Sequence, residues 1–99
     1  MINGTYKISM QLPKELESGK VTFKVSGGRL SGVLRAADGD IVCSFSNGRI
    51  NGNHFEFSGI IHKFIFKIRF TARGEIQGDK LTAVAYSKHG TFTITGSRE

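Results

Sequence analysis

Two aspartates and two histidines are the residues whose types and spacing first suggest chemistry. Asp38 and Asp40 flank a glycine, and His62 and His89 each occur in a short polar segment further along the chain. Carboxylates beside imidazoles can bind a divalent cation or transfer protons. Turns also contain Asp and His because these residues tolerate turn geometry and solvent, and no tight spacing such as His-x-His marks a metal site. We therefore keep the four as a candidate ligand site and predict no metal and no cofactor.

Cys43 is the only cysteine, so the chain forms neither an internal disulfide nor a cysteine-based zinc cluster. No partner base stands near it in the sequence, and it occupies an apolar position of a strand pattern. We expect a buried, unreactive thiol rather than a nucleophile, and we identify no catalytic residue.

These residues must be positioned by strands, because polar and apolar residues alternate with a period of two. The alternation is strict over residues 5–12 and 21–25, and it recurs over 64–72 with Ile65 as one outward exception. No segment has the spacing of an amphipathic helix. A chain of 99 residues holds one hydrophobic core, so we predict a single all-β domain over 1–99. Its strands cover roughly 4–12, 20–26, 29–36, 41–50, 54–61, 64–76, 80–87 and 91–97.

Three turns share one pattern, in which a glycine-led pair stands between polar and then apolar residues. The pairs are Gly27-Gly28, Gly52-Asn53 and Gly78-Asp79. Such pairs are typical of two-residue β-hairpins, whose twist matches that of the strands. They predict the cross-strand partners Val25–Leu30, Ile50–Phe55 and Ile76–Leu81, with Arg49 opposite Glu56. A slip in the alternation at Asn47-Gly48 predicts a β-bulge.

Eight sequential antiparallel strands favour an up-and-down barrel, which removes exposed sheet edges; a two-sheet sandwich is the alternative. In either case the three hairpins and both termini share one end. The opposite end receives the longer connections, over residues 13–19, 37–40, 61–63 and 87–90. We therefore expect the aspartates and histidines to gather on one rim together with Glu15 and Glu17.

The inward positions are almost entirely apolar, and all eight phenylalanines are among them. An eight-stranded barrel is either filled by side chains or able to hold one small ligand, and both outcomes stay open. Residues that would line a ligand cavity include Tyr6, Met10, Phe45 and Phe66. The full inward set is Tyr6, Ile8, Met10, Leu12, Val21, Phe23, Val25, Leu30, Leu34, Ile41, Cys43, Phe45, Phe55, Phe57, Ile61, Phe64, Phe66, Ile68, Phe70, Ile76, Leu81, Phe92 and Ile94.

The outward positions suggest two kinds of partner. Apolar residues gather on the third to seventh strands, which favours a subunit interface in a homo-oligomer. They are Val33, Val42, Ile60, Ile65, Val84 and Tyr86. The net charge of +6 and the outward Lys67, Arg69 and Arg73 allow nucleic-acid binding as an alternative. Aromatic and cationic side chains occupy opposite faces, so base stacking is not available and we regard nucleic acid as a lesser alternative.

The turns and the closing strands also resemble a known group. The runs Phe70-Thr71-Ala72-Arg73-Gly74-Glu75-Ile76-Gln77-Gly78-Asp79-Lys80-Leu81-Thr82 and Gly90-Thr91-Phe92-Thr93-Ile94-Thr95-Gly96-Ser97-Arg98 are similar to small uncharacterised bacterial β-barrel domains. That group has a calycin-like or streptavidin-like shape, which the resemblance implies here. The matching residues are turn and core positions, so no functional residue is carried over.

Taken together, these features predict a non-enzymatic binding or assembly module for a small apolar ligand. No apolar run is long enough to cross a bilayer as a helix, and we expect no membrane partner and a cytoplasmic location. A small enzyme that uses the Asp38, Asp40, His62 and His89 rim is the alternative from a different class.

Overall fold

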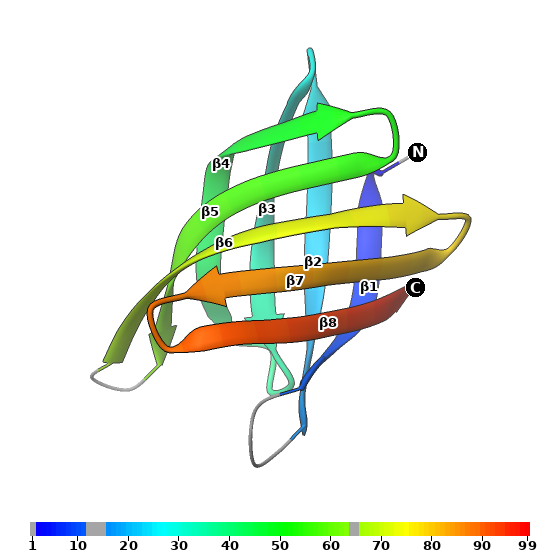
Figure 1. The fold of residues 1–99 in the computed structure, drawn as a ribbon. Coiled ribbons are helices and arrows are strands. Elements are labelled where there is room, and N and C mark those ends of the chain that lie inside the picture. The colour runs from blue at the N-terminus through cyan, green and yellow to red at the C-terminus, as the bar shows by residue number, and fades with distance from the viewer. Residues whose placement is uncertain (1, 12–15, 64–65) are drawn as a thin grey trace.

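The computed structural model describes residues 2–11, 16–63 and 66–99 and shows a closed antiparallel barrel of eight strands in sequential order (Figure 1). The strands at the back cross those at the front at a steep angle. This confirms the predicted up-and-down barrel. The described part contains no helix that could cross a membrane. The strands are β1 Gly4–Gln11, β2 Leu16–Ser26, β3 Arg29–Ala36, β4 Ile41–Asn51, β5 His54–Lys63, β6 Phe66–Gln77, β7 Lys80–Ser87 and β8 Gly90–Arg98.

The predicted hairpins and their register are confirmed. Val25 pairs with Leu30, Ile50 with Phe55, Ile76 with Leu81, and Arg49 with Glu56. The leading glycine of each turn has a positive φ, for example 62° at Gly78, which the two-residue hairpin requires. β2 begins at Leu16, so it takes up part of the 13–19 segment expected to be loop. The pairing between β1 and β2 extends as far as Gln11 and Leu16.

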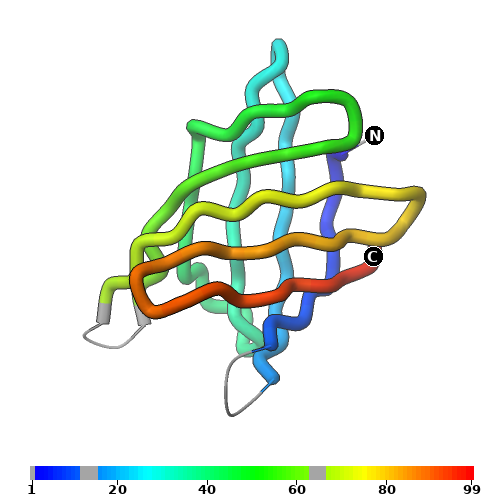
Figure 2. The backbone as a smooth tube through the Cα atoms, in the orientation of Figure 1, coloured from blue at the N-terminus to red at the C-terminus, as the bar shows by residue number. Residues whose placement is uncertain are grey.

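Two register shifts interrupt the ladder between β3 and β4. One lies between the pairs Leu30–Gly48 and Gly32–Phe45, which confirms the predicted bulge, and Figure 2 shows β4 turning sharply along its length. The second lies next to Val42, where Arg35 pairs with Ile41 and Leu34 pairs with Cys43. This second bulge reverses two expected orientations. Ile41, expected inside, is 54% exposed, and Val42, expected outside, packs against the core.

The barrel has two unlike ends. We call the one with the three hairpins the hairpin end and the other the open end. At the hairpin end, Asn53 donates its side-chain amide to the Ile76 carbonyl at 3.0 Å and accepts the Ile76 N–H on its own carbonyl at 2.9 Å. The Tyr6 hydroxyl donates to the Ile2 carbonyl at 2.9 Å. The first two bonds tie the β4–β5 hairpin to β6, and the third ties the N-terminal residues to β1.

The core is an aromatic cluster concentrated toward the hairpin end. Phe23 contacts four other aromatic rings, and Phe45 stacks on Phe57 with ring centroids 3.9 Å apart. Small residues of β6 and β7 face this cluster, because Ala72, Ala83 and Ala85 are all buried. Large rings on one wall and methyl groups on the opposite wall fill a narrow barrel without overlap. Five of the eight phenylalanines are buried, Phe92 is half-buried, and Phe64 and the side chain of Phe66 fall outside the described part.

On six strands one inward-facing position is occupied by glycine. The alternation of polar and apolar residues did not predict this feature. A Cβ at any of these glycines would come closer than 3.0 Å to an atom of another strand. The missing side chain lets a strand bend over its neighbour, which is how a small barrel closes. The six are Gly19, Gly32, Gly48, Gly59, Gly74 and Gly96.

Candidate ligand site at the open end

The open end is lined by apolar side chains that point inward and remain partly exposed. Met10 lies near the end of β1, Ile61 near the end of β5, and Phe92 near the start of β8; each packs against the core and is half-buried. Ile68 pairs with Ile61 across β5 and β6 and is also half-buried. The longer connections that we expected at this end are present between β1 and β2 and between β3 and β4, whereas β5–β6 and β7–β8 are joined by two residues each. Among the described residues, no aromatic cluster like that of the core covers these side chains. We call Met10, Ile61, Ile68 and Phe92 together the apolar mouth.

Small buried residues lie below this mouth. Ala85, directly opposite Phe92, is 2% exposed, and Cys43 is also 2% exposed. Burial raises the pKa of the Cys43 thiol, partly offset by a hydrogen bond from the backbone of Ile60. The thiol is therefore a small apolar group in this wall, as the sequence predicted. Neither the apolar side chains named above nor the buried Cys43 thiol offers a group for acid–base chemistry.

The predicted interior residues separate into two places. Met10 belongs to the mouth. Tyr6 and Phe45 belong to the aromatic core at the hairpin end, where burial raises the pKa of Tyr6 and its hydroxyl is used by Ile2. Phe66 starts β6 at the open end, but its side chain is outside the described part. The four residues predicted to line one cavity therefore do not all lie in one place: Tyr6 and Phe45 lie in the aromatic core and Met10 lies at the open end.

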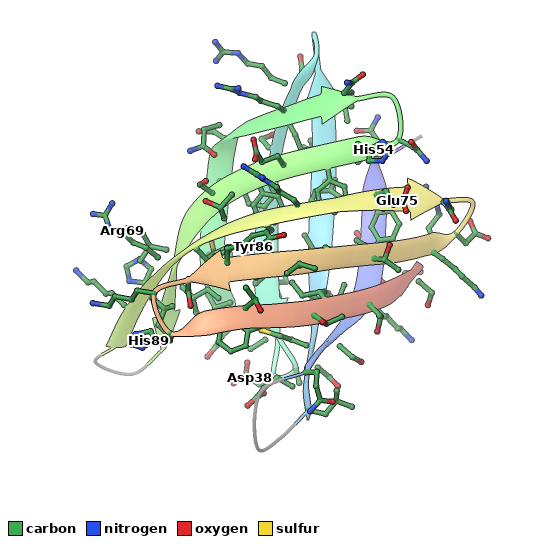
Figure 3. All side chains as sticks on the ribbon, in the orientation of Figure 1. Asp38, His54, Arg69, Glu75, Tyr86 and His89 are labelled. Carbon is green, nitrogen blue, oxygen red and sulfur yellow. The ribbon has the colours of Figure 1, made fainter. Side chains whose placement is uncertain are left out.

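The predicted rim residues all lie at the open end, with Asp38 and Asp40 on the β3–β4 connection, His62 in β5 and His89 in the β7–β8 turn. Figure 3 shows Asp38 and His89 apart from each other. Asp38 accepts a hydrogen bond from the Asp40 N–H at 3.0 Å, which stabilises the turn between β3 and β4. His89 lies in the β7–β8 turn, half a circuit of eight strands away. His62 is the last residue but one of β5 and is exposed. Among the described residues no three His, Cys, Asp or Glu side chains gather as a metal site, so the rim does not bring this chemistry together. Glu17 pairs with Met10 within the β1–β2 ladder, and Glu15 lies outside the described residues.

The predicted interface residues do not form one surface. Val33 is on β3 between Thr22 and Ser44, whereas Val84 and Tyr86 are on β7, four strands away. Val42 packs on the core, and Ile65 lies outside the described residues. Tyr86 is 45% exposed, with the Arg73 guanidinium 5.9 Å from its ring centroid. The oligomeric state stays a prediction.

Ionic pairs on the outer face of β5 to β7 were only partly foreseen. Glu56 pairs with Arg73 across β5 and β6, in addition to facing Arg49 in the register. Two residues along the strands, His54 Nε2 lies 3.4 Å from Glu75 Oε2. These residues line a shallow outer hollow of about 890 Å³. Glu56 and Arg73 neutralise each other's charge, so this face does not present an unpaired charge cluster, and exposed pairs of this kind contribute little to stability.

Comparison with known proteins supports the fold and goes no further. No protein-family model matches the chain, and no curated protein matches it. Solved structures do match. One redesigned β-barrel has a TM-score of 0.76 and 13% identity, covering 99% of this chain and 91% of that chain. A redesigned barrel bound to DFHBI has a TM-score of 0.71 and 14% identity, covering 98% and 94%.

A third solved structure, a de novo designed fluorescence-activating β-barrel, has a TM-score of 0.66 and 13% identity, covering 98% of this chain and 93% of that chain. At such identities the likeness shows the shared fold, a small eight-stranded barrel. The resemblance to bacterial calycin-like domains stays an expectation.

Proposed function

We propose that this barrel is a non-enzymatic binding protein that takes a small apolar ligand through its open end. The observation that carries the proposal is the difference between the two ends. At the hairpin end, hydrogen bonds and the buried ring of Phe55 cover the interior, although Val25 and Ile50 beside the turns are half-buried. At the open end Met10, Ile61 and Phe92 are all half-buried, and among the described residues no aromatic cluster covers them. A neutral apolar molecule seated on Met10, Ile61 and Phe92 would remove this surface from water, which is favourable.

Two further facts support a ligand at this place. The nearby thiol is buried and the described rim carboxylates and imidazoles do not cluster, so the mouth is suited to binding rather than to a reaction. A similar barrel fold is bound to the dye DFHBI in one of the solved structures. The single cysteine suits a reducing compartment, and we place the binding protein in the cytoplasm.

The proposal is tested by titrating the protein with Nile red, a neutral apolar dye, and following its fluorescence. We compare Ile61→Asn with Ile60→Asn, because the two residues are adjacent on β5 and face opposite sides of the barrel wall. Partial burial of an isoleucine contributes on the order of 1.4 kcal/mol, so Ile61→Asn should weaken binding roughly tenfold. Ile60→Asn should leave the affinity within about twofold of the original.

Circular dichroism and the melting temperature confirm that both variants keep the barrel. The proposal is wrong if the unchanged protein does not bind the dye. It is also wrong if the two variants lose affinity equally, because the dye would then bind the outer surface. If Ile61→Asn fails to fold, Phe92→Ser at the other side of the mouth replaces it, with Thr91→Ser as its outward control.

A further inference from the structure

Cations on the outer faces of neighbouring strands fall into one line around the barrel. In the register, Lys7 of β1 is opposite Lys20 of β2, and Lys20 is opposite Arg35 of β3. On the other side of β1, Lys7 is opposite Ser97 of β8, and Ser97 is opposite Lys80 of β7. We call Lys80, Lys7, Lys20 and Arg35 the cationic row. Like charges directly opposite each other destabilise a sheet, so folding alone does not account for this arrangement.

The cationic row lies in a hollow that also offers hydroxyl groups. The hollow has a volume of about 810 Å³ and is lined by all four cations. Ser97 stands within the row, and the adjacent outward positions are Ser18, Ser9 and Thr95, which are opposite one another across β2, β1 and β8. Ammonium and guanidinium groups interleaved with hydroxyl donors match the several acceptor oxygens of a phosphate group.

A carboxylate of the chain itself already lies on this row. Lys20 Nζ donates to Glu99 Oε1 at 2.6 Å, and the Glu99 backbone N–H donates to the Thr5 carbonyl at 2.9 Å. The hydrogen bond from Lys20 and the nearby positive charge lower the pKa of the Glu99 carboxyl. Among the described residues no carboxylate forms an ion pair with Lys7 or Lys80, and Arg35 donates to the Gly39 carbonyl at 3.3 Å. The row therefore holds more positive charge than its own anion neutralises.

Negative groups limit the size of what the row can hold. Asp38 lines one side of the hollow, and Asp79, next to Lys80 in its hairpin, lies 3.4 Å from Arg98 Nε. The lining contains no aromatic side chain that could stack on a base. A long polyanion that continued past the row would meet these carboxylates, whereas a compact ligand would not.

We propose that the cationic row binds a compact phosphate-bearing ligand, which displaces the Glu99 carboxylate from Lys20. This site is separate from the apolar mouth, so it stands whether or not the barrel binds an apolar molecule. The phosphate could belong to a free small molecule or to a lipid headgroup, since both present the same oxygens to the row.

Isothermal titration with inorganic pyrophosphate tests the site. Lys7→Glu reverses one charge within the row, and Lys24→Glu makes the same change on β2 opposite Ser31, outside the hollow. Loss of a charge-assisted hydrogen bond should weaken binding at least tenfold in Lys7→Glu. Lys24→Glu should change the affinity about twofold or less at 0.15 M salt, where distant charges are screened. Glu99→Gln should tighten binding severalfold, because Lys20 is no longer occupied by a carboxylate.

Vesicles that contain phosphatidic acid distinguish the two sources. Binding to the vesicles but not to pyrophosphate, lost in Lys7→Glu and kept in Lys24→Glu, supports the site and assigns a lipid headgroup. No binding to either probe overturns the proposal. Equal losses in Lys7→Glu and Lys24→Glu also overturn it, because net charge rather than the row would then attract the probe. If Lys7→Glu does not fold, Lys7→Gln is measured against Lys24→Gln.

Discussion

Replacing Gly74 by alanine should destabilise the barrel strongly, although the change adds one methyl group to a wall of small residues. A Cβ at position 74 would lie 2.6 Å from the Ala83 Cβ and 2.8 Å from the Ala83 Cα, and closer still to the Thr82 carbonyl oxygen. Two of these three atoms are backbone of β7. Because β6 and β7 are hydrogen-bonded on both sides of this point, from Thr71–Tyr86 to Gln77–Lys80, the strands cannot separate locally.

The expected magnitude follows from this rigidity. Overpacking a core typically costs about 1–3 kcal/mol, and contact with backbone puts Gly74→Ala near the upper limit. Alanine gains about 0.5–1 kcal/mol over glycine from the smaller entropy of its unfolded chain, which leaves a net loss of about 2 kcal/mol. For a domain of this size that corresponds to a fall in melting temperature on the order of 8–16 °C. Urea denaturation and calorimetry measure both values.

Gly59→Ala is the matched comparison, since it makes the same change on the neighbouring strand β5. The three atoms nearest to its Cβ would all belong to side chains, with Cys43 Sγ at 2.6 Å and the Phe70 ring at 3.4 Å. Side chains adjust more easily than backbone, so the loss should be about 1 kcal/mol or less. Adding Cys43→Ala should recover part of the stability lost in Gly59→Ala. The reasoning is refuted if Gly74→Ala is as stable as the original protein, or if Gly59→Ala is the more damaging of the two.

Two further predictions concern buried polar groups. Tyr6→Phe should cost about 1–3 kcal/mol in urea denaturation at pH 8, because the buried Ile2 carbonyl loses its donor. Since burial raises the pKa of Tyr6 above its ordinary 10.0, the stability it contributes is present below pH 10 and lost as pH rises through the higher folded value. Stability should therefore fall less between pH 9 and 11.5 in Tyr6→Phe, and equal slopes would contradict this. Burial also raises the pKa of Cys43 and shields the thiol from solvent. A water-soluble disulfide reagent should therefore label Cys43 only as fast as the barrel opens, and urea should accelerate the labelling. Rapid labelling of the native protein would instead show that the thiol is at the surface.

The sequence was most informative where local chemistry determines geometry. The Gly-led turn pairs require positive φ, and their flanking apolar residues define the register, so Val25–Leu30 and Ile76–Leu81 could be paired without a structure. The bulge near Gly48 was visible because it changes the phase between two strongly apolar positions. Here the local pattern and the tertiary structure agree.

Where geometry depends on distant strands, the sequence was less informative. Ile41 and Val42 are both apolar, so the alternation looked the same with or without the bulge that exchanges their faces. Val33 and Val84 looked like one surface because both are outward apolar residues, but closure of the barrel separates them by half a circuit. The four residues of the cationic row come from four strands, and only the complete register brings them together.

The Asp and His rim shows the same limit for the candidate site. The topology placed these residues correctly at one end, but Asp38 forms a local turn and His89 lies across the mouth. The mouth residues Met10 and Ile61 carried no distinguishing signal, since an inward apolar residue looks the same whether it is covered or half-exposed.

The seam between β4 and β5 determines how this barrel can open. Within the described residues, β4 and β5 form ladder pairs only from Arg49–Glu56 to Asn51–His54, whereas β5 and β6 are paired along their whole length. Beyond that ladder the wall is held by Phe45 stacked on Phe57. Besides the hydrogen bond from the Ile60 backbone to Cys43, side-chain packing rather than a ladder joins the two strands there. We therefore expect local opening to begin at this seam, which would widen the barrel sideways toward the open end; backbone amides of β4 should then exchange hydrogen faster than those of β6.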